Sequence, residues 1–117
     1  MLHDIVTHND VVKLVDNFYS RVVNDALLAP FFTGIDFEHH KPRMVHFWTF
    51  VLLDEPGYTT NIFDKHAQMA LTKDVLQQWI LLFEQTARHF FSGEKTEQAI
   101  LRAKTIAWTF QEKMKLE

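Results

Sequence analysis

The chain has 117 residues, 47% of them hydrophobic, which is enough for one domain with a buried core. Its formal charge of −3 includes no block of basic residues, which argues against nucleic acid as a partner. It contains no cysteine, so the fold needs no disulfide and no thiolate can be a nucleophile or a metal ligand.

The first half of the chain predicts two long helices joined by a corner. Thr7 or Asn9 can cap a helix that runs to about Asn24 and turns Tyr19 toward the interior. The corner at 26–32 contains a proline that prevents one continuous helix. Asp36 can then cap a second helix over residues 37–53.

His40 lies on the apolar stripe of this second helix, together with Met44 and Trp48. Pro42 removes one backbone hydrogen bond and weakens the turn beside His40 if the helix begins at residue 37. Alternatively, the helix begins near Lys41 with Pro42 in its first turn. We expect the weakness to let His40 swing between an inward and an outward position.

The middle of the chain places a second histidine of interest on a short helical segment at 61–69, after a Pro-Gly turn. His66 shares a face there with Phe63 and Ala67. Buried without a partner, the imidazole would cost about 1–3 kcal/mol. A haem iron in an apolar pocket would use it fully, whereas a partly exposed histidine is the commoner arrangement.

Two further helices complete the chain. Thr72 can cap a helix that runs to about Ser92, with Gly93 ending it, and the last helix covers about 95–115. No segment alternates with period two, so we expect no strand and assign the chain to the all-α class as a single domain over residues 1–117.

One family carries the same landmarks in the same order. They are Phe18-Tyr19, Leu28-Ala29-Pro30-Phe31-Phe32, His40 followed by Phe47-Trp48, Lys65-His66, and Gln78-Trp79-Ile80-Leu81-Leu82-Phe83. From about Ile5 to Met114 this order resembles the truncated haemoglobins, and most of all their third group. The chain also has no Gly-Gly pair, which the first two groups usually carry and the third lacks. It departs from the family in its short corner loop, in Thr59-Thr60 where a glycine is usual, and in Pro42.

The resemblance implies a shortened globin fold, in which two helix pairs form a two-over-two sandwich around haem b. His66 matches the proximal ligand of the iron, and Tyr19, His40 and Trp79 match the three distal positions. The remaining residues expected to contact the haem are Phe32, Arg43, Met44, Phe47, Trp48, Tyr58, Ile62, Phe63, Lys65 and Leu76.

The chemistry of these residues suits a gas-binding site. The Tyr19 hydroxyl and the Trp79 indole N–H can donate hydrogen bonds to a bound gas molecule, and His40 can donate, gate the pocket or ligate the iron. Arg43 and Lys65 can reach the anionic edge of a haem, or can simply be solvated surface charges.

Three functions remain open at this point. The first is reversible binding of oxygen, nitric oxide or carbon monoxide. The second is a haem enzyme that detoxifies nitric oxide or peroxide with electrons from an external reductase. The third is a helical interaction module without haem, although the chain has neither the repeated Glu-x-x-His of di-iron bundles nor the His-Glu-x-x-His of zinc enzymes.

The setting expected from the sequence is the cytoplasm. The longest apolar runs are too short to span a bilayer, and the N-terminus lacks the pattern of a signal peptide. We expect a monomer or a weak dimer.

Overall fold

The computed structural model describes residues 2–57 and 71–115 of the chain. Four α-helices and one short 3-10 helix make up this part, and no strand occurs in it, as the sequence predicts. They are α1 (His8–Val22), η1 (Ala29–Phe32), α2 (Phe37–Leu53), α4 (Lys73–Phe90) and α5 (Glu94–Lys113). The short helical segment expected at 61–69 lies outside the described residues.

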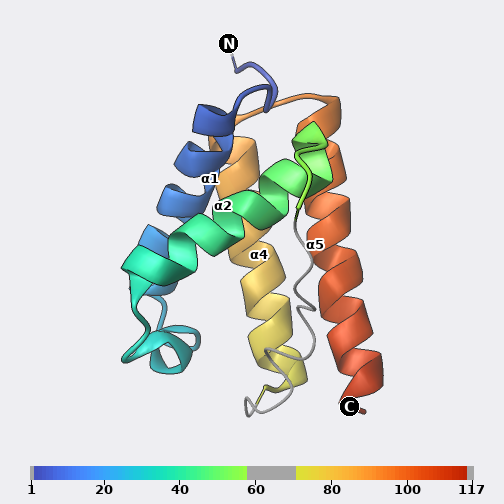
Figure 1. The fold of residues 1–117 in the computed structure, drawn as a ribbon. Helices are drawn as coiled ribbons and strands as arrows, with labels where there is room; N and C mark the ends of the chain where they lie inside the picture. Colours follow the sequence, from blue (N-terminus) through green and yellow to red (C-terminus); the bar gives the residue numbers. More distant parts are fainter. Residues whose placement is uncertain (1, 58–70, 116–117) are drawn as a thin grey trace.

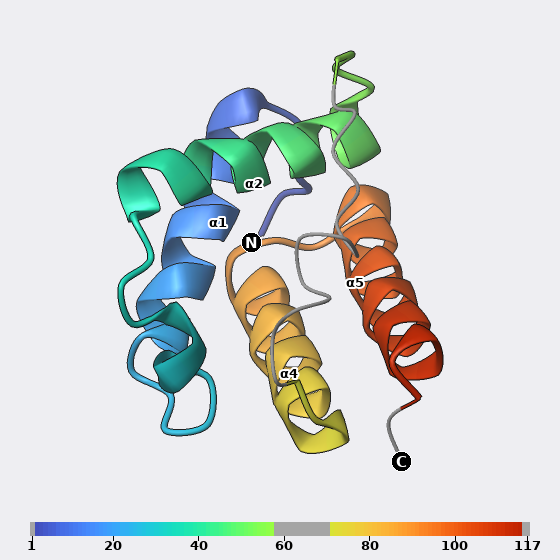
Figure 2. The ribbon, with the colours of Figure 1, turned by 60° about the horizontal axis from the view of Figure 1, so that its bottom comes forward.

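The four helices form two stacked pairs (Figure 1). α1 packs against α2, which crosses it, and α4 runs antiparallel beside α5 (Figure 2). The pairs meet where α1 packs on α4 and α2 on α5. This is the two-over-two arrangement expected from the resemblance.

Each long helix except α5 begins with the side-chain cap that the sequence predicts. Thr7, Asp36 and Thr72 accept backbone N–H groups from Asp10, Glu38 and Val75. At α1 the Asp10 carboxylate also accepts the N–H of Thr7, which completes a capping box. These caps fix where each helix starts, and therefore which side chains face inward.

The helix ends differ from the prediction more than the starts do. α1 ends at Val22 and α4 at Phe90, each two residues before the expected end. Gly93 does not terminate α4 directly but occupies the N-cap position of α5, with φ at 144°. α2 begins at Phe37 with Pro42 inside it, which selects the longer of the two alternatives for this helix.

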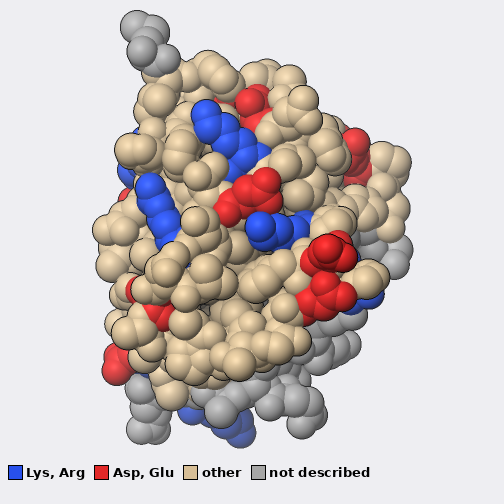
Figure 3. All heavy atoms as spheres, turned by 90° about the vertical axis from the view of Figure 1, so that its left-hand side faces the viewer, with Lys and Arg blue, Asp and Glu red and all other residues tan. Residues whose placement is uncertain are grey.

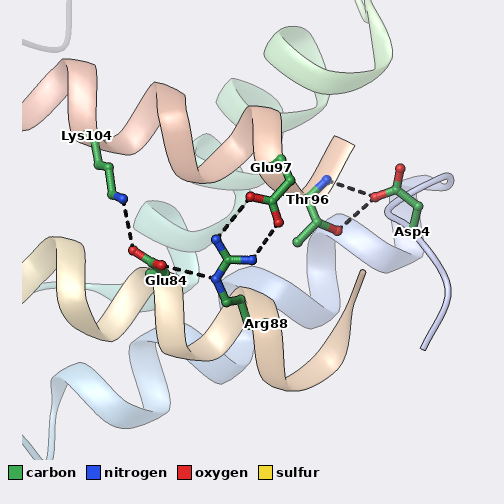
Figure 4. Close-up of polar contacts among 6 residues, drawn as sticks. All are labelled: Asp4, Glu84, Arg88, Thr96, Glu97 and Lys104. Atoms are coloured by element: carbon green, nitrogen blue, oxygen red, sulfur yellow. Dashed lines mark hydrogen bonds and ion pairs between the residues drawn. The ribbon is translucent and has the colours of Figure 1, made fainter. Parts of the chain in front are cut away.

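An N-terminal clasp holds the start of α5, and Asp4 is its centre (Figure 4). The Asp4 carboxylate accepts hydrogen bonds from the backbone N–H groups of Lys95 and Thr96 and from the Thr96 hydroxyl, all at 2.8 Å. These bonds outweigh the partial burial of Asp4 and lower the pKa of its carboxyl group. A Cβ on Gly93 would lie 2.5 Å from Asp4 Cγ, so the clasp requires glycine there.

An ionic network joins α4 to α5 near the same end of the pair (Figure 4). Arg88 binds Glu97 with two hydrogen bonds, at 2.6 and 3.0 Å, and Glu84 with one at 3.1 Å. Lys104 extends the network, with its Nζ 3.2 Å from Glu84. The two carboxylates and two cations neutralise one another across the helix pair.

The surface around α1 carries charges of both signs. On the face shown in Figure 3, lysine and arginine side chains alternate with aspartate and glutamate and merge into no basic field. None of the described helices is long and apolar enough to cross a membrane.

We predict that Asp4→Ala lowers the free energy of unfolding by about 1–2 kcal/mol, because two N–H groups at the start of α5 lose their acceptor. Urea unfolding measures the change. Asp16→Ala, which removes only a surface ion pair with Lys41, is the matched control and should cost at most about 0.5 kcal/mol.

The same effect should depend on pH. The pKa of Asp4 is lowered by folding, so its contribution is present above the pKa of an unfolded aspartate and is lost as pH falls through the lowered value. Wild type and Asp4→Ala should therefore converge in acid. A difference that persists undiminished in acid would contradict the clasp.

Candidate functional site

A cavity of about 270 Å³ lies between the two helix pairs. α1, the corner, α2, α4 and α5 all contribute to its wall, and most of the contributing side chains are apolar or aromatic. The described residues that line it are Phe18, Tyr19, Leu28, Phe31, Phe32, Ile35, His40, Arg43, Met44, Phe47, Trp48, Leu71, Val75, Leu76, Trp79, Phe83, Ile106, Ala107 and Phe110.

Every predicted site residue that the structure describes lines this cavity. These are Tyr19, Phe32, His40, Arg43, Met44, Phe47, Trp48, Leu76 and Trp79. The remaining five, Tyr58, Ile62, Phe63, Lys65 and His66, lie outside the described residues. The role of each stays a prediction, but the described side chains do surround one space.

Tyr19 and His40 form the polar centre of this wall. The Tyr19 hydroxyl lies 2.8 Å from His40 Nε2, and the tautomer of the imidazole decides which of the two donates. The Tyr19 side chain is only 6% exposed, and this burial raises the pKa of its phenol. The phenol therefore stays protonated at physiological pH and keeps an O–H that can donate.

Aromatic rings fix the position of Tyr19. Its ring contacts those of Phe18, Phe32 and Phe37, with centroids 5.1 to 5.6 Å apart. His40 meets it edge-on at 5.1 Å. Because these rings come from α1, the corner and α2, the Tyr19 hydroxyl is held where the three elements meet.

Trp79 brings a second N–H donor to the cavity from α4. Its ring meets Phe18 edge-on and stacks on Phe83, both with centroids 6.1 Å apart. Trp48 stacks on the same Phe83 at 4.9 Å. The two tryptophans therefore share Phe83 as a common support, which links the walls formed by α2 and α4.

The inward position of His40 follows from the start of α2. The carbonyl of the cap residue Asp36 accepts the backbone N–H groups of His39 and His40, at 3.1 and 2.9 Å. This first turn directs His40 toward Tyr19, while His39 is exposed. The described position of His40 is the inner one of the two that we expect.

Sequence reasoning missed part of the wall. Leu28, Phe31 and Ile35 from the corner and Leu71 before α4 were not expected to line a site. Ile106, Ala107 and Phe110 recur at helical spacing on α5, but a helical stripe does not tell a core position from a cavity wall. Only the packing of several elements separates the two.

The side chains that line the cavity fit haem on chemical grounds. Flat aromatic and aliphatic side chains form most of the wall, as an apolar macrocycle requires, and the polar groups are few and localised. Arg43 lines the cavity while remaining exposed, which suits the anionic propionates. Within residues 2–57 and 71–115, no three His, Cys, Asp or Glu side chains gather as a metal site would need.

Comparison with known proteins settles the family. The family model for bacterial-like globins matches residues 2–112. The chain belongs to the bacterial-like globin family. It is a truncated haemoglobin and therefore a haem-binding protein.

Two likenesses place this globin near the third group of truncated haemoglobins. The group 3 truncated haemoglobin ctb of Campylobacter jejuni is 26% identical over 118 residues, which covers 95% of this chain and 93% of the relative. The crystal structure of a group III truncated haemoglobin from Campylobacter jejuni superimposes with a TM-score of 0.88 and 26% identity. That match covers 97% of this chain and 95% of the other.

We predict that Tyr19 of this globin does not ionise in the ordinary tyrosine range, because burial raises the pKa of its phenol. The chain has two tyrosines, so the tyrosinate absorbance gained between about pH 9 and 11 should be the same in wild type and Tyr19→Phe. An ultraviolet pH titration measures it. A variant that loses half of the signal would show that Tyr19 is accessible to solvent.

Proposed function

We propose that this globin holds haem b through His66 and reversibly binds a diatomic gas, oxygen foremost, beside Tyr19, His40 and Trp79. The observation that supports this most is the hydrogen-bonded pair of buried Tyr19 and half-buried His40 in a mainly apolar cavity. Haem supplies an iron with an open position for the gas. The b type fits because a chain without cysteine cannot form the thioether bonds of c-type haem.

Tyr19 is the donor with the clearest role in this proposal. If His40 donates from Nε2 to the phenol oxygen, the Tyr19 O–H is free to point at the gas. The Trp79 indole is a donor only and can point the same way. A gas that acquires negative charge on binding gains from such donors, and carbon monoxide, which acquires less, gains less.

An enzymatic role remains the second candidate, and the same pair supports it. A phenol hydrogen-bonded to an imidazole can pass a proton toward a bound gas and be reprotonated from Nε2. Consumption of nitric oxide or peroxide in the presence of an external reductase would favour detoxification over carriage. We place the protein in the cytoplasm as a monomer or weak dimer under either role.

His66→Ala should abolish stable haem binding, because the iron then loses its only strong protein ligand. Titration with haem, followed at the Soret band, measures the affinity. His89→Ala, which alters an exposed histidine on α4, is the control and should bind haem as wild type does. Wild-type spectrum and affinity in His66→Ala would refute the ligand assignment.

Tyr19→Phe and Trp79→Phe should each speed oxygen release by about ten- to a hundredfold, since each removes a hydrogen bond to a charged acceptor. Stopped-flow release rates measure the effect. The two effects should be non-additive because both donors serve one ligand. Unchanged release in both variants would rule out the donor network but would not bear on the proposal that the protein binds haem.

A further inference from the structure

One carboxylate ties the corner between α1 and α2 to α4. Asp25 Oδ1 accepts hydrogen bonds from the backbone N–H groups of Leu27 and Leu28, at 2.9 and 3.0 Å. Asp25 Oδ2 accepts a third from Gln78 Nε2 at 2.6 Å, across 53 positions of sequence. In the part of the chain that the structure describes, no other side-chain hydrogen bond joins residues 23–36 to α4.

Both ends of the Asp25–Gln78 bond adjoin the cavity. Leu28, whose N–H binds Asp25, is 1% exposed and lines the cavity with Phe31 and Phe32 of the same corner. On α4 the neighbour of Gln78 is Trp79, which lines it from the opposite element. Neither Asp25 nor Gln78 lines the cavity, so both act through these neighbours.

The bond is built to persist at neutral pH. The hydrogen bond from Gln78 is the main cause that lowers the pKa of the Asp25 carboxyl, and the N–H groups of Leu28 and Leu27 add to it. Two charged residues lie four positions away along the chain. Arg21 on α1 precedes Asp25 by four positions and donates to Thr86, and the exposed Asp74 on α4 precedes Gln78 by four. The carboxylate thus stays ionised and keeps accepting from Gln78.

We propose that the Asp25–Gln78 bond is a latch on the corner wall of the haem pocket, and that its opening sets how fast a gas molecule enters and leaves. The inference rests on the proposed function, because it concerns passage into the same pocket. A barrier common to entry and exit changes both rates by one factor and leaves the equilibrium between bound and free states unchanged. A hydrogen-bond donor to the gas would instead change release alone.

Gln78→Leu removes the latch and keeps the two backbone bonds of Asp25. In the haem-loaded full chain, association and dissociation of carbon monoxide should both rise about tenfold, with the dissociation constant changed by less than about twofold. Flash photolysis and stopped-flow displacement measure the two rates. Gln77→Leu makes the same chemical change at the adjacent, exposed position and should leave both rates as in wild type.

Gln78→Glu makes the latch depend on pH. At neutral pH the new carboxylate repels that of Asp25, so this variant should show the fast rates of Gln78→Leu. At about pH 5 the two can share one proton, and Asp74 one turn away adds to the field that favours it. The rates should then return toward wild type. Each rate is divided by the wild-type rate at the same pH, so that pH effects common to both proteins cancel. A general loss of packing would not recover in acid.

The latch can also be tested without haem. Hydrogen exchange of the Ala29 and Phe31 amides, which bond to the carbonyls of Asp25 and Leu28, reports how firmly the corner is held. In the haem-free chain Gln78→Leu should speed their exchange about tenfold, and Gln77→Leu should not. This readout separates the latch from the proposed function, whose failure would appear as a wild-type chain that binds no haem.

Several results would overturn the latch. One is unchanged exchange at both amides in Gln78→Leu. Another is a change in carbon monoxide dissociation alone, which would mean that Gln78 acts on the bound gas. Equal effects from Gln77→Leu, or fast rates in Gln78→Glu that persist at about pH 5, would trace the change to α4 as a whole.

Discussion

The hydrogen bond between Tyr19 and His40 depends on how α1, the corner and α2 are placed, and it forms the polar centre of the cavity wall. A phenol that is 6% exposed would cost about 1–3 kcal/mol if it had no partner, so the fold must bring one to it. The Asp36 cap supplies it by directing His40 from the first turn of α2. The start of one helix therefore determines the polar group that faces the pocket.

Along the α4–α5 pair, the hydrogen bonds and ion pairs between segments lie at one end and the mainly apolar cavity lies toward the other. Near the connection between these helices, Asp4 holds the start of α5 and Arg88 joins both helices through carboxylates. Farther along the same two helices, the apolar side chains of Leu76 and Phe110 line the cavity. Strong electrostatic contacts thus hold one end of the pair, and a space lined mainly by apolar side chains lies toward the other.

Local signals in the sequence predicted much of the fold and part of the site. Caps such as Thr7 and Thr72 bond to a backbone N–H three residues away, so they can be recognised directly in the sequence. The helical stripe of the first helix likewise predicts that Tyr19 points inward. Gly93 was misread because one glycine can end a helix or precede the next, and the Asp4 contact that decides between them comes from 89 positions away. The contribution of Leu28 was missed because the corner shows no helical periodicity in its apolar residues. His66 and Lys65 lie outside the described residues, so the roles expected of them stay predictions.

Asp4 and Asp25 show how one chemical device serves two purposes. Each carboxylate accepts backbone N–H groups and a distant side-chain donor, and each has a lowered pKa for that reason. Asp4 holds the start of α5, where the described contacts are structural, whereas Asp25 holds a segment whose neighbours line the cavity. Loss of the first should therefore appear in unfolding, and loss of the second in the passage of gas. Stability and ligand kinetics can vary independently in this globin because separate carboxylates support them.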